Sequence, residues 1–296
     1  MKLIAFILYK IFAFMLRVCP KFIMKPILKL WSKMAFSLNK KHKKIAFANL
    51  DFAYGDEISF KRKEEIVRGA YDNLIYNLYE FIANQDYVLE DMDKMVNIKD
   101  DHYIKDAIAN DEKIILVTAH YASWEMAIPY ISLKYRPISV IAKEMKNEYF
   151  TQMYEDVRNL HNVNMLEKRK AAKGMVKAFK EKRILAMAID QSIPSYESST
   201  IEFFGKKVTQ TDSPVRIASK FGATIIPVLF IRDGFEKHNA YFSEPIKVAK
   251  DVSEDDIINT SQKISKVFEK QIKDKPEDWF WQHKRFKEFN RDIYEQ

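Results

Sequence analysis

The sequence predicts an α/β fold, with a largely parallel central sheet flanked by helices. Two observations predict this fold class. Apolar runs of four to eight residues recur from residue 113 onward, and amphipathic stretches of helical length separate them. Buried parallel strands are almost continuously apolar because helices cover both faces of such a sheet. The chain of 296 residues is 47% hydrophobic, which is enough for the core of one large domain.

Helices and strands are expected to alternate through most of the chain. Ser59 is a candidate N-cap for the first helix of this region. The helices are predicted at residues 59–84, 101–110, 123–134, 147–161, 170–182, 211–221 and 254–274. The strands are predicted at residues 113–118, 137–142, 163–166, 184–189 and 224–231. Ligands of such sheets bind beyond the carboxyl ends of the strands, and His120 and Asp190 each follow a predicted strand at that edge.

The basic charge of the chain is concentrated at its start. Residues 1–50 hold eleven of the 49 Lys and Arg residues and no Asp or Glu. The segment from Leu3 to Leu16 is apolar, but it is shorter than the roughly 20 residues that span a bilayer. Lysines interspersed with Phe, Ile, Leu and Trp are typical of a helix on a membrane surface. We therefore predict a hydrophobic, membrane-associated anchor over residues 1–22 and one catalytic domain over residues 23–296.

The N-terminal segment matches three further roles less well. A cleaved signal peptide would need an A-x-A site, and a nucleic-acid-binding arm would contain fewer Phe, Leu and Ile residues. An ordinary buried helix with a basic outer face is the main alternative. The single cysteine, Cys19, excludes a disulfide framework and a cysteine-built metal site within one chain.

The stretch KIILVTAHYASWEMAIPY places His120 between a predicted strand and a predicted helix, with Glu125 five residues further on. Residues five apart in one helix point about 140° apart, because each residue turns the helix by about 100°. A His in the turn and a Glu at the start of the helix can still meet. The same spacing recurs at His283 and Glu288, so only the strand-to-helix context favours the first pair.

Such a pair suits general-base chemistry. A neutral imidazole can take a proton from a hydroxyl. A carboxylate on its other nitrogen fixes the tautomer and stabilises the cation that forms. The alternative is a structural His that caps a helix and bonds to a nearby Glu. The pair alone leaves both roles open.

Longer stretches carry a resemblance to a known family. AHYASWE resembles the H-x4-E/D motif of the bacterial late lipid A biosynthesis acyltransferases, the lauroyl and myristoyl type within the lysophospholipid acyltransferase superfamily. Three later blocks and one earlier block are similar to those of this family, in the right order: EKRKAAKGMVKAFKEKRILAMAIDQ, IEFFGKKVTQTDSPVRIASKFGATIIPV, PEDWFWQHKRFK and, earlier, ANLDFAYGD. Ser123 stands where the family often has Asn, and Lys143-Glu144 stands where it often has Arg-Pro. Lys keeps the charge of Arg but lacks its bidentate geometry, which puts headgroup recognition at this position in doubt.

The resemblance implies transfer of a fatty acyl chain from an acyl carrier protein thioester to a hydroxyl of a lipid A precursor. It also implies a place at the cytoplasmic face of the inner membrane. His120 would remove the hydroxyl proton, and Glu125 would orient His120. The thioester is already activated, so no cofactor and no metal is expected, and no nucleic-acid partner is expected.

Residues that bind the acceptor are expected around this pair. Lys143 and Arg169 are candidates for binding phosphate or sugar-acid groups, with a solvated surface charge as the alternative for each. Asp190 is a candidate to orient Arg169 or to bond the sugar, with a turn or cap as its alternative. Arg285 is expected to pack in a Trp–Arg cluster rather than to contact a phosphate.

Two other functions stay open on the sequence alone. Acyltransferases that act on glycerophospholipids typically carry Asp at the second motif position and a later Pro-Glu-Gly-Thr-like motif, whereas this chain has Glu125 and no such motif. A non-catalytic lipid-binding protein of the same fold would not need His120 for its cellular role.

Overall fold

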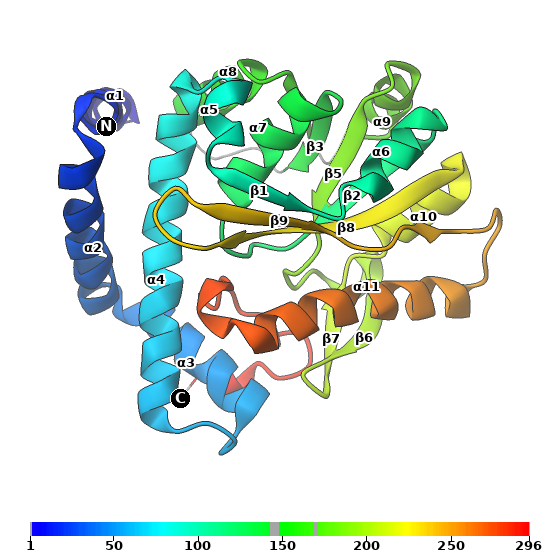
Figure 1. The fold of residues 1–296 in the computed structure, drawn as a ribbon. Helices are drawn as coiled ribbons and strands as arrows, with labels where there is room; N and C mark the ends of the chain where they lie inside the picture. The colour runs from blue at the N-terminus through cyan, green and yellow to red at the C-terminus, as the bar shows by residue number, and fades with distance from the viewer. Residues whose placement is uncertain (1, 143–147, 168–170, 296) are drawn as a thin grey trace.

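A single large sheet forms the centre of the protein, and helices lie on both of its faces (Figure 1). The computed structural model describes residues 2–142, 148–167 and 171–295. The strand order is β1-β9-β8-β2-β5-β3-β4, and β10 pairs with β8. The strands of this sheet are β1 Val96–Lys99, β2 Lys113–Thr118, β3 Ile138–Ala142, β4 Val163–Glu167, β5 Ile184–Ala188, β8 Ala223–Arg232, β9 His238–Phe242 and β10 Ile246–Lys247.

Five consecutive strands, β8, β2, β5, β3 and β4, run parallel to one another, which confirms the predicted largely parallel sheet. The five predicted strands coincide with these five within one residue at each end. The antiparallel part was not predicted. β9 and β10 run antiparallel to β8, and β1 is parallel to β9. A separate hairpin of β6 (Ser199–Phe203) and β7 (Lys206–Gln210) also went unpredicted.

The seven predicted helices are all present, each within two residues of its predicted ends. Ser59 caps the first of them, accepting a hydrogen bond from Arg62 N at 3.2 Å. These helices are α4 Phe60–Ala83, α6 His102–Ala109, α7 Trp124–Lys134, α8 Glu148–Asn159, α9 Ala171–Lys180, α10 Ser213–Phe221 and α11 Glu254–Asp274. A short helix, α5 (Leu89–Asp93), precedes β1.

The sheet has an apolar core on each face because successive strand residues point to opposite sides. On one face, Ile115, Leu185 and Ile225 pack in a core with residues of α9, α10 and α11. On the other face, Leu116 and Ile226 pack in a core with residues of α6 and α7. The two faces are therefore covered by different helices, and the carboxyl ends of the parallel strands lie between the two layers.

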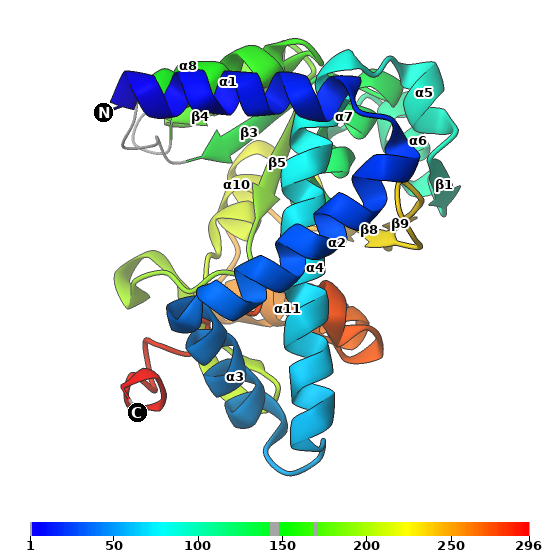
Figure 2. The same cartoon turned by 90° about the vertical axis from the view of Figure 1, so that its left-hand side faces the viewer.

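The N-terminal segment forms two helices where the sequence predicted one anchor. α1 spans Lys2–Val18 and α2 spans Lys21–Leu38, with a break at Cys19 and Pro20. α3 (Lys40–Tyr54) follows. α1 crosses over α8, and α2 runs obliquely along the long helix α4 (Figure 2). Within the described part of the chain, no helix is both long and apolar enough to cross a membrane.

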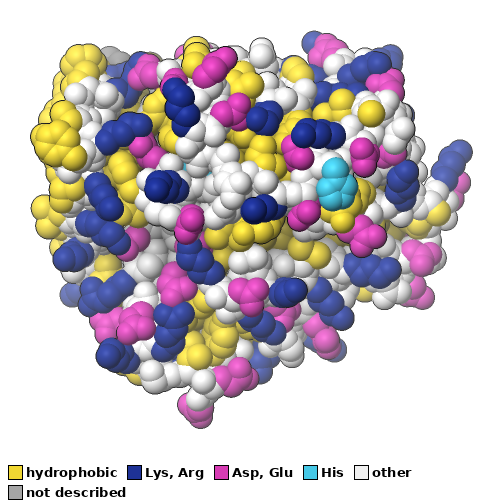
Figure 3. Space-filling view, viewed as in Figure 1, with side chains coloured by type: hydrophobic (Ala, Val, Ile, Leu, Met, Phe, Trp, Pro, Cys, Tyr) yellow, Lys and Arg dark blue, Asp and Glu magenta, His cyan; other side chains and the backbone are white. Residues whose placement is uncertain are grey.

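Both of these helices have one buried and one exposed apolar face. Leu16, Met24 and Leu28 are buried in a core shared with α4 and α8. In Figure 3, apolar side chains gather along the margin where Figure 1 shows α1 and α2. The exposed large apolar side chains of the two helices are Ile7, Ile11, Phe14, Met15, Val18, Phe22, Ile23, Leu30, Met34 and Leu38. Half of the twenty exposed large apolar residues of the described chain thus lie on α1 and α2.

Candidate active site

His120 and Asp190 lie side by side at the carboxyl edge of the sheet. β2 and β5 are neighbouring parallel strands, and their register pairs Thr118 with Ala188. Each of the two polar residues follows its strand by two positions, so the register that pairs the strands also brings His120 and Asp190 together. This confirms the predicted location of both residues at this edge.

Asp190 binds His120 through both carboxylate oxygens. His120 Nδ1 lies 2.8 Å from Asp190 Oδ1, and the main-chain N–H of His120 donates to Oδ2 at 3.0 Å. Trp279 Nε1 also donates to Oδ2, at 2.9 Å. When Nδ1 carries the proton and donates it to the carboxylate, the lone pair of Nε2 is left for a substrate proton.

The two charges shift each other's pKa. Burial alone would lower the pKa of His120, but the Asp190 charge and hydrogen bond raise it above its ordinary value, and Glu125 adds to this effect. Burial would raise the pKa of Asp190. The His120 charge and the hydrogen bonds from His120 and Trp279 outweigh burial and lower that pKa to about 2. Asp190 is therefore a carboxylate at neutral pH, and His120 is a stronger base than a free imidazole.

The C-terminal segment holds the loop that carries His120. Phe280 N donates to His120 O at 3.0 Å, and Tyr121 forms an antiparallel bridge with Trp279. The ring of Phe280 lies 6.3 Å from the imidazole, and that of Trp124 lies 5.7 Å from it. The block PEDWFWQHKRFK thus contacts both the main chain and the ring of His120.

Arg285, in the same block, packs in the core as predicted. It is 1% exposed, its Nη1 donates to Thr209 O at 2.6 Å, and its guanidinium lies over the Phe203 ring. Burial lowers the pKa of Arg285 to about 10.

Glu125 does not occupy the position that the sequence predicted. Its carboxylate accepts hydrogen bonds from Arg158 Nη2 at 2.5 Å, Tyr154 OH at 3.0 Å and Trp124 Nε1 at 3.1 Å. The carboxylate on His120 Nδ1 is that of Asp190 instead. Glu125 is the second residue of α7, where its side chain reaches α8 rather than turning back to the ring. A part for Glu125 in the reaction stays a prediction.

Arg158 and Tyr154 are site residues that the sequence analysis missed. They are four residues apart on α8, so they share a face of that helix, and Arg158 Nη2 donates to Tyr154 OH at 2.8 Å. Arg158 is 4% exposed, and the Glu125 charge helps to raise its pKa although burial opposes this. The sequence did show Tyr154 and Arg158 at helical spacing in a predicted helix. It gave no indication that Glu125 would be their partner.

An apolar pocket of about 340 Å³ lies between α7, α8 and the sheet. His120, Glu125 and Gln191 line it at the carboxyl edge of the strands. The residues that line it further along the strands and α7 are apolar, among them Ile128, Ile131, Ile138, Val140, Ala186 and Val228. The polar pair therefore borders a hollow whose walls suit a hydrocarbon chain.

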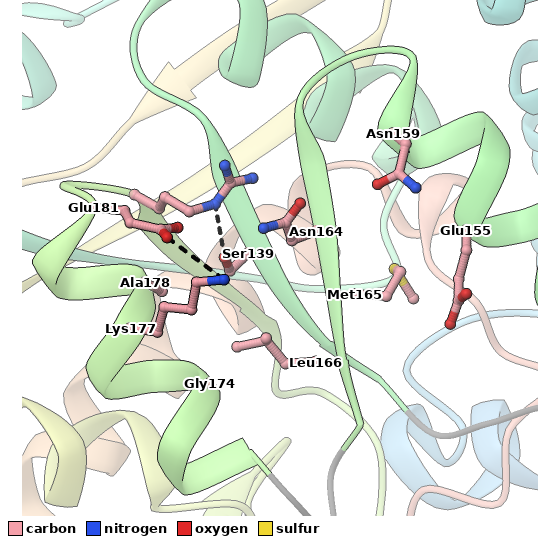
Figure 4. A pocket seen from close by; sticks show the side chains of 11 residues that line it. Ser139, Glu155, Asn159, Asn164, Met165, Leu166, Gly174, Lys177, Ala178 and Glu181 are labelled. Carbon is pink, nitrogen blue, oxygen red and sulfur yellow. Dashed lines mark hydrogen bonds and ion pairs between the residues drawn. The ribbon is translucent and has the colours of Figure 1, made fainter.

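A smaller hollow of about 260 Å³ lies at the edge strand β4, between α8 and α9 (Figure 4). Its basic groups are already bonded within it. Arg183 Nε donates to Ser139 Oγ at 3.0 Å, and Lys177 forms an ion pair with Glu181 at 3.6 Å. This hollow is more polar than the pocket at His120, and it does not contain the His–Asp pair.

His283, the alternative histidine with the same spacing to a glutamate, has a structural role. Its Nε2 accepts a hydrogen bond from Ser192 N at 3.0 Å. Burial lowers the pKa of His283 to about 4, so the ring is neutral near pH 7. His120, which the strand-to-helix context favoured, lines the pocket at the carboxyl edge of the sheet, and its part in the reaction stays a prediction.

The remaining predicted site residues are outside the described part of the chain. Lys143 and Arg169 fall in the segments 143–147 and 168–170, so the predicted pairing of Asp190 with Arg169 stays untested. Among residues 2–142, 148–167 and 171–295, no group of three or more His, Cys, Asp or Glu side chains is placed to hold a metal ion.

The fold and the site define an α/β protein in which a hydrogen-bonded His–Asp pair lies at the mouth of an apolar pocket. The sequence model of the bacterial lipid A biosynthesis acyltransferases matches residues 1–288, so the chain belongs to this family. It is an acyltransferase of lipid A biosynthesis, as the sequence motifs predicted.

The sequence identity to individual relatives is low. The chain is 24% identical to the lipid A biosynthesis lauroyltransferase of Escherichia coli (strain K12) over 256 residues, which cover 86% of this chain and 82% of that one. The crystal structure of the 1-acyl-sn-glycerophosphate (LPA) acyltransferase PlsC from Thermotoga maritima is similar with a TM-score of 0.40 and 16% identity. That similarity covers 85% of this chain and 98% of that one.

Proposed function

We propose that this chain transfers a fatty acyl chain from an acyl carrier protein thioester to a hydroxyl group of a lipid A precursor. The family supports the pathway, and one observation supports the chemistry. His120 is bonded through Nδ1 to Asp190 and lines an apolar pocket of about 340 Å³. A base and a site for a hydrocarbon chain therefore adjoin each other.

In the proposed reaction, Nε2 of His120 takes the proton of the acceptor hydroxyl as its oxygen attacks the thioester carbonyl carbon. The new C–O bond forms, and the C–S bond breaks when the tetrahedral intermediate collapses. The thiolate of the carrier leaves and receives the proton from the imidazolium. Asp190, which is buried, stabilises that imidazolium through the hydrogen bond at Nδ1.

The acyl chain of the donor occupies the apolar pocket in this proposal. The walls from α7 and from β3, β5 and β8 present methyl and methylene groups along its length, and each buried CH₂ contributes about 0.8 kcal/mol. The thioester carbonyl then lies at the carboxyl edge of the strands, beside His120.

Glu125 and Arg158 act as a pair in this proposal. Their ion pair fixes the indole N–H of Trp124 and the hydroxyl of Tyr154 at the wall of the pocket. The negative charge of Glu125 also favours the protonated imidazole. Glu125 would therefore assist His120 from a distance, while Asp190 orients it directly. Lys143 and Arg169 stay candidates for binding the acceptor headgroup.

The proposed site of action is the cytoplasmic face of the inner membrane. The exposed apolar residues of α1 and α2 lie beside lysines such as Lys10, Lys25 and Lys33, and residues 1–50 contain no acidic side chain. Apolar side chains that enter the acyl region, flanked by lysines that meet anionic headgroups, favour a helix pair that lies on the membrane.

The direct test is an acyl-transfer assay in detergent. The purified full chain is mixed with a series of acyl carrier protein thioesters and a tetra-acylated lipid A precursor, and products are weighed by mass spectrometry. His120→Gln removes the base, and His102→Gln is the matched control on the exposed surface of α6. We expect one added acyl chain with the wild type and with His102→Gln, and none with His120→Gln.

The same assay can reject the proposal. Transfer by His120→Gln at the wild-type rate would remove His120 from the mechanism. Transfer to lysophosphatidic acid but not to the lipid A precursor would reassign the acceptor.

A further inference from the structure

We propose that Asn77 is a positioning residue of the acyl transfer, because its buried amide clamps the loop between His120 and Glu125 from both ends. This inference rests on the proposed function of His120. Asn77 lies on α4, more than forty residues before the loop, and is 2% exposed.

Both polar atoms of the Asn77 amide bind this loop. Its Nδ2 donates to Ala122 O at 2.5 Å, and its Oδ1 accepts from Glu125 N at 3.2 Å. Nδ2 also donates to Asn73 O, one turn earlier in α4, at 2.8 Å. Ala122 and Glu125 flank the start of α7, so one rigid side chain sets the distance between the end of the loop and the first turn of that helix.

The loop needs such support because its backbone is in an unfavourable conformation. Ala122 has φ of +43°, in the left-handed region that costs a non-glycine residue about 1 kcal/mol or more. Remote groups hold the loop in this conformation. Ala122 N donates to Asp278 O at 2.6 Å, and Ser123 N donates to Phe230 O at 3.1 Å. The conformation of the loop therefore depends on hydrogen bonds to residues outside it.

Asn77 belongs to a row of buried polar residues on one face of α4. Asn73, Asn77 and Glu80 are spaced four and three residues apart, so they share one face of the helix, and each is at most 5% exposed. Arg232, at the end of β8, donates Nε to Asn73 Oδ1 at 2.9 Å and Nη2 to Glu80 Oε2 at 2.9 Å. These bonds hold Asn73, whose main-chain oxygen accepts one of the hydrogen bonds of Asn77 Nδ2.

The consequence concerns His120, which lies two residues before Ala122. A change in the loop would tilt the imidazole relative to Asp190 and to Glu125, because these two carboxylates are held by β5 and by α7 separately. A misplacement of about 1 Å at a reacting group can cost about 100-fold in rate. Asn77 does not itself line the pocket, and its amide bonds the main chain of Ala122 and Glu125 rather than the imidazole, so it would act on the reaction through the loop and the first turn of α7.

The test compares three single variants in the detergent assay. Asn77→Leu keeps the size of the side chain and removes both bonds. Asn77→Asp keeps the acceptor for Glu125 N but donates to Ala122 O only when its carboxyl is protonated. Thr224→Val is the matched control, since Thr224 is 5% exposed and its hydroxyl donates to the Glu112 carboxylate at the amino end of the strands, opposite the site. Each rate is divided by the folded fraction, measured by circular dichroism at the same pH.

We expect Asn77→Leu to lower kcat about 10- to 100-fold at every pH, with KM within about threefold of the wild type. For Asn77→Asp we expect the ratio of its kcat to that of the wild type to rise as pH falls, because the protonated carboxyl restores the donor. Thr224→Val is expected to change the melting temperature but not the kcat of the folded protein.

Normal kcat in folded Asn77→Leu would overturn the inference. An equal loss of kcat in Asn77→Leu and Thr224→Val, or a loss in Asn77→Asp that does not depend on pH, would overturn it as well. If the Asn77 variants do not fold, Ala122→Gly tests the same loop, since glycine accepts φ of +43° without strain but widens the range of loop conformations. We then expect a lower kcat with an unchanged or higher melting temperature, and an unchanged kcat would overturn the inference. Absence of transfer by the wild type would instead reject the proposed function, and with it the reaction that Asn77 is proposed to serve.

Discussion

The imidazole of His120 is hydrogen-bonded to the carboxylate of Asp190, which follows β5 and lies seventy residues further along the chain. The bond to Asp190 raises the pKa of the imidazole against the opposing effect of burial. A general base works only in its neutral form, so activity is expected to rise with pH as His120 loses its proton, above the ordinary imidazole value of about 6.5.

Asp190→Asn should reveal this dependence. Without the negative charge, the imidazolium is no longer stabilised and burial dominates, so the pKa of His120 falls and the acid limb of the kcat/KM profile moves to lower pH. The amide also no longer fixes the tautomer, so kcat is expected to fall on the order of 10³-fold. A pH–rate profile with Asp93→Asn as the surface control measures both effects, and an unmoved acid limb would contradict them.

Glu125 and Arg158 give a second prediction for single residues. Glu125→Ala is expected to lower turnover severely, and it should also cost about 3–5 kcal/mol of stability because it leaves the buried Arg158 without its ion-pair partner. The double variant Glu125→Gln with Arg158→Met removes both charges, so its stability should largely recover. Urea denaturation and turnover separate the two effects, since recovery of turnover in the double variant would show that Glu125 is only structural.

The sequence predicted the location of the site residues better than their partners. His120 and Asp190 were both expected at the carboxyl edge because each follows an apolar strand. Their hydrogen bond depends on β2 and β5 being neighbours, and strand order cannot be read from apolar runs alone. Glu125 was assigned to His120 by its proximity in sequence, whereas its carboxylate is bonded to Arg158 on α8.

Among the elements, α7 begins directly after the loop that carries His120 and then forms a wall of the apolar pocket. Ala127, one turn into the helix, is 6% exposed and lines that pocket. A larger side chain at this position would shorten the space for the acyl chain.

Ala127→Leu is therefore expected to shift the preferred donor toward shorter chains. Excluding two methylenes costs about 1.6 kcal/mol, or about tenfold in relative kcat/KM between donors that differ by two carbons. Competition between thioesters of different length, read by mass spectrometry, measures this shift. Ala107→Leu on α6 overpacks the same core without lining the pocket, so the same shift in that variant would contradict the prediction.

The elements that the sequence predicted have a strong local pattern, which is a continuous apolar run in the strands and a helical spacing of apolar residues in the helices. The strands that it missed lack such a run. β2, β5 and β8 are apolar runs, and α11 was predicted to the residue. β1 has the sequence VNIK and β9 has HNAYF, short segments with polar residues that pair at one edge of the sheet. Their strand conformation comes from pairing with each other and with β8, a tertiary effect that no local pattern records.

At the scale of the whole molecule, α1 connects the proposed membrane surface to the active site. Its buried face packs with Met153 and Val157 of α8, and α8 also carries Tyr154 and Arg158. The ring of Phe6 stacks on Tyr149 at 5.7 Å. Helix α1 thus has an outward face available to lipid and an inward face that supports a wall of the pocket.

Two substitutions on this helix should separate these roles. Phe14 is 64% exposed and Leu16 is 4% exposed. Phe14→Ser is expected to weaken sedimentation with anionic vesicles while leaving turnover in detergent unchanged. Leu16→Ser is expected to lower turnover in detergent, because α8 loses its support. Equal vesicle binding by Phe14→Ser and the wild type would place the membrane contact elsewhere.

The bridge between Tyr121 and Trp279 has a consequence for biosynthesis. A ribosome makes α1 and α2 first, every strand of the sheet next, and Trp279 only after α11. A nascent chain therefore exposes the apolar faces of α1 and α2 while its imidazole still lacks the indole that bonds Asp190 and the peptide group that bonds His120. If the proposed membrane binding holds, targeting precedes enzymatic competence during translation, and chains cut short before this segment are expected to occupy the membrane without acylating lipid.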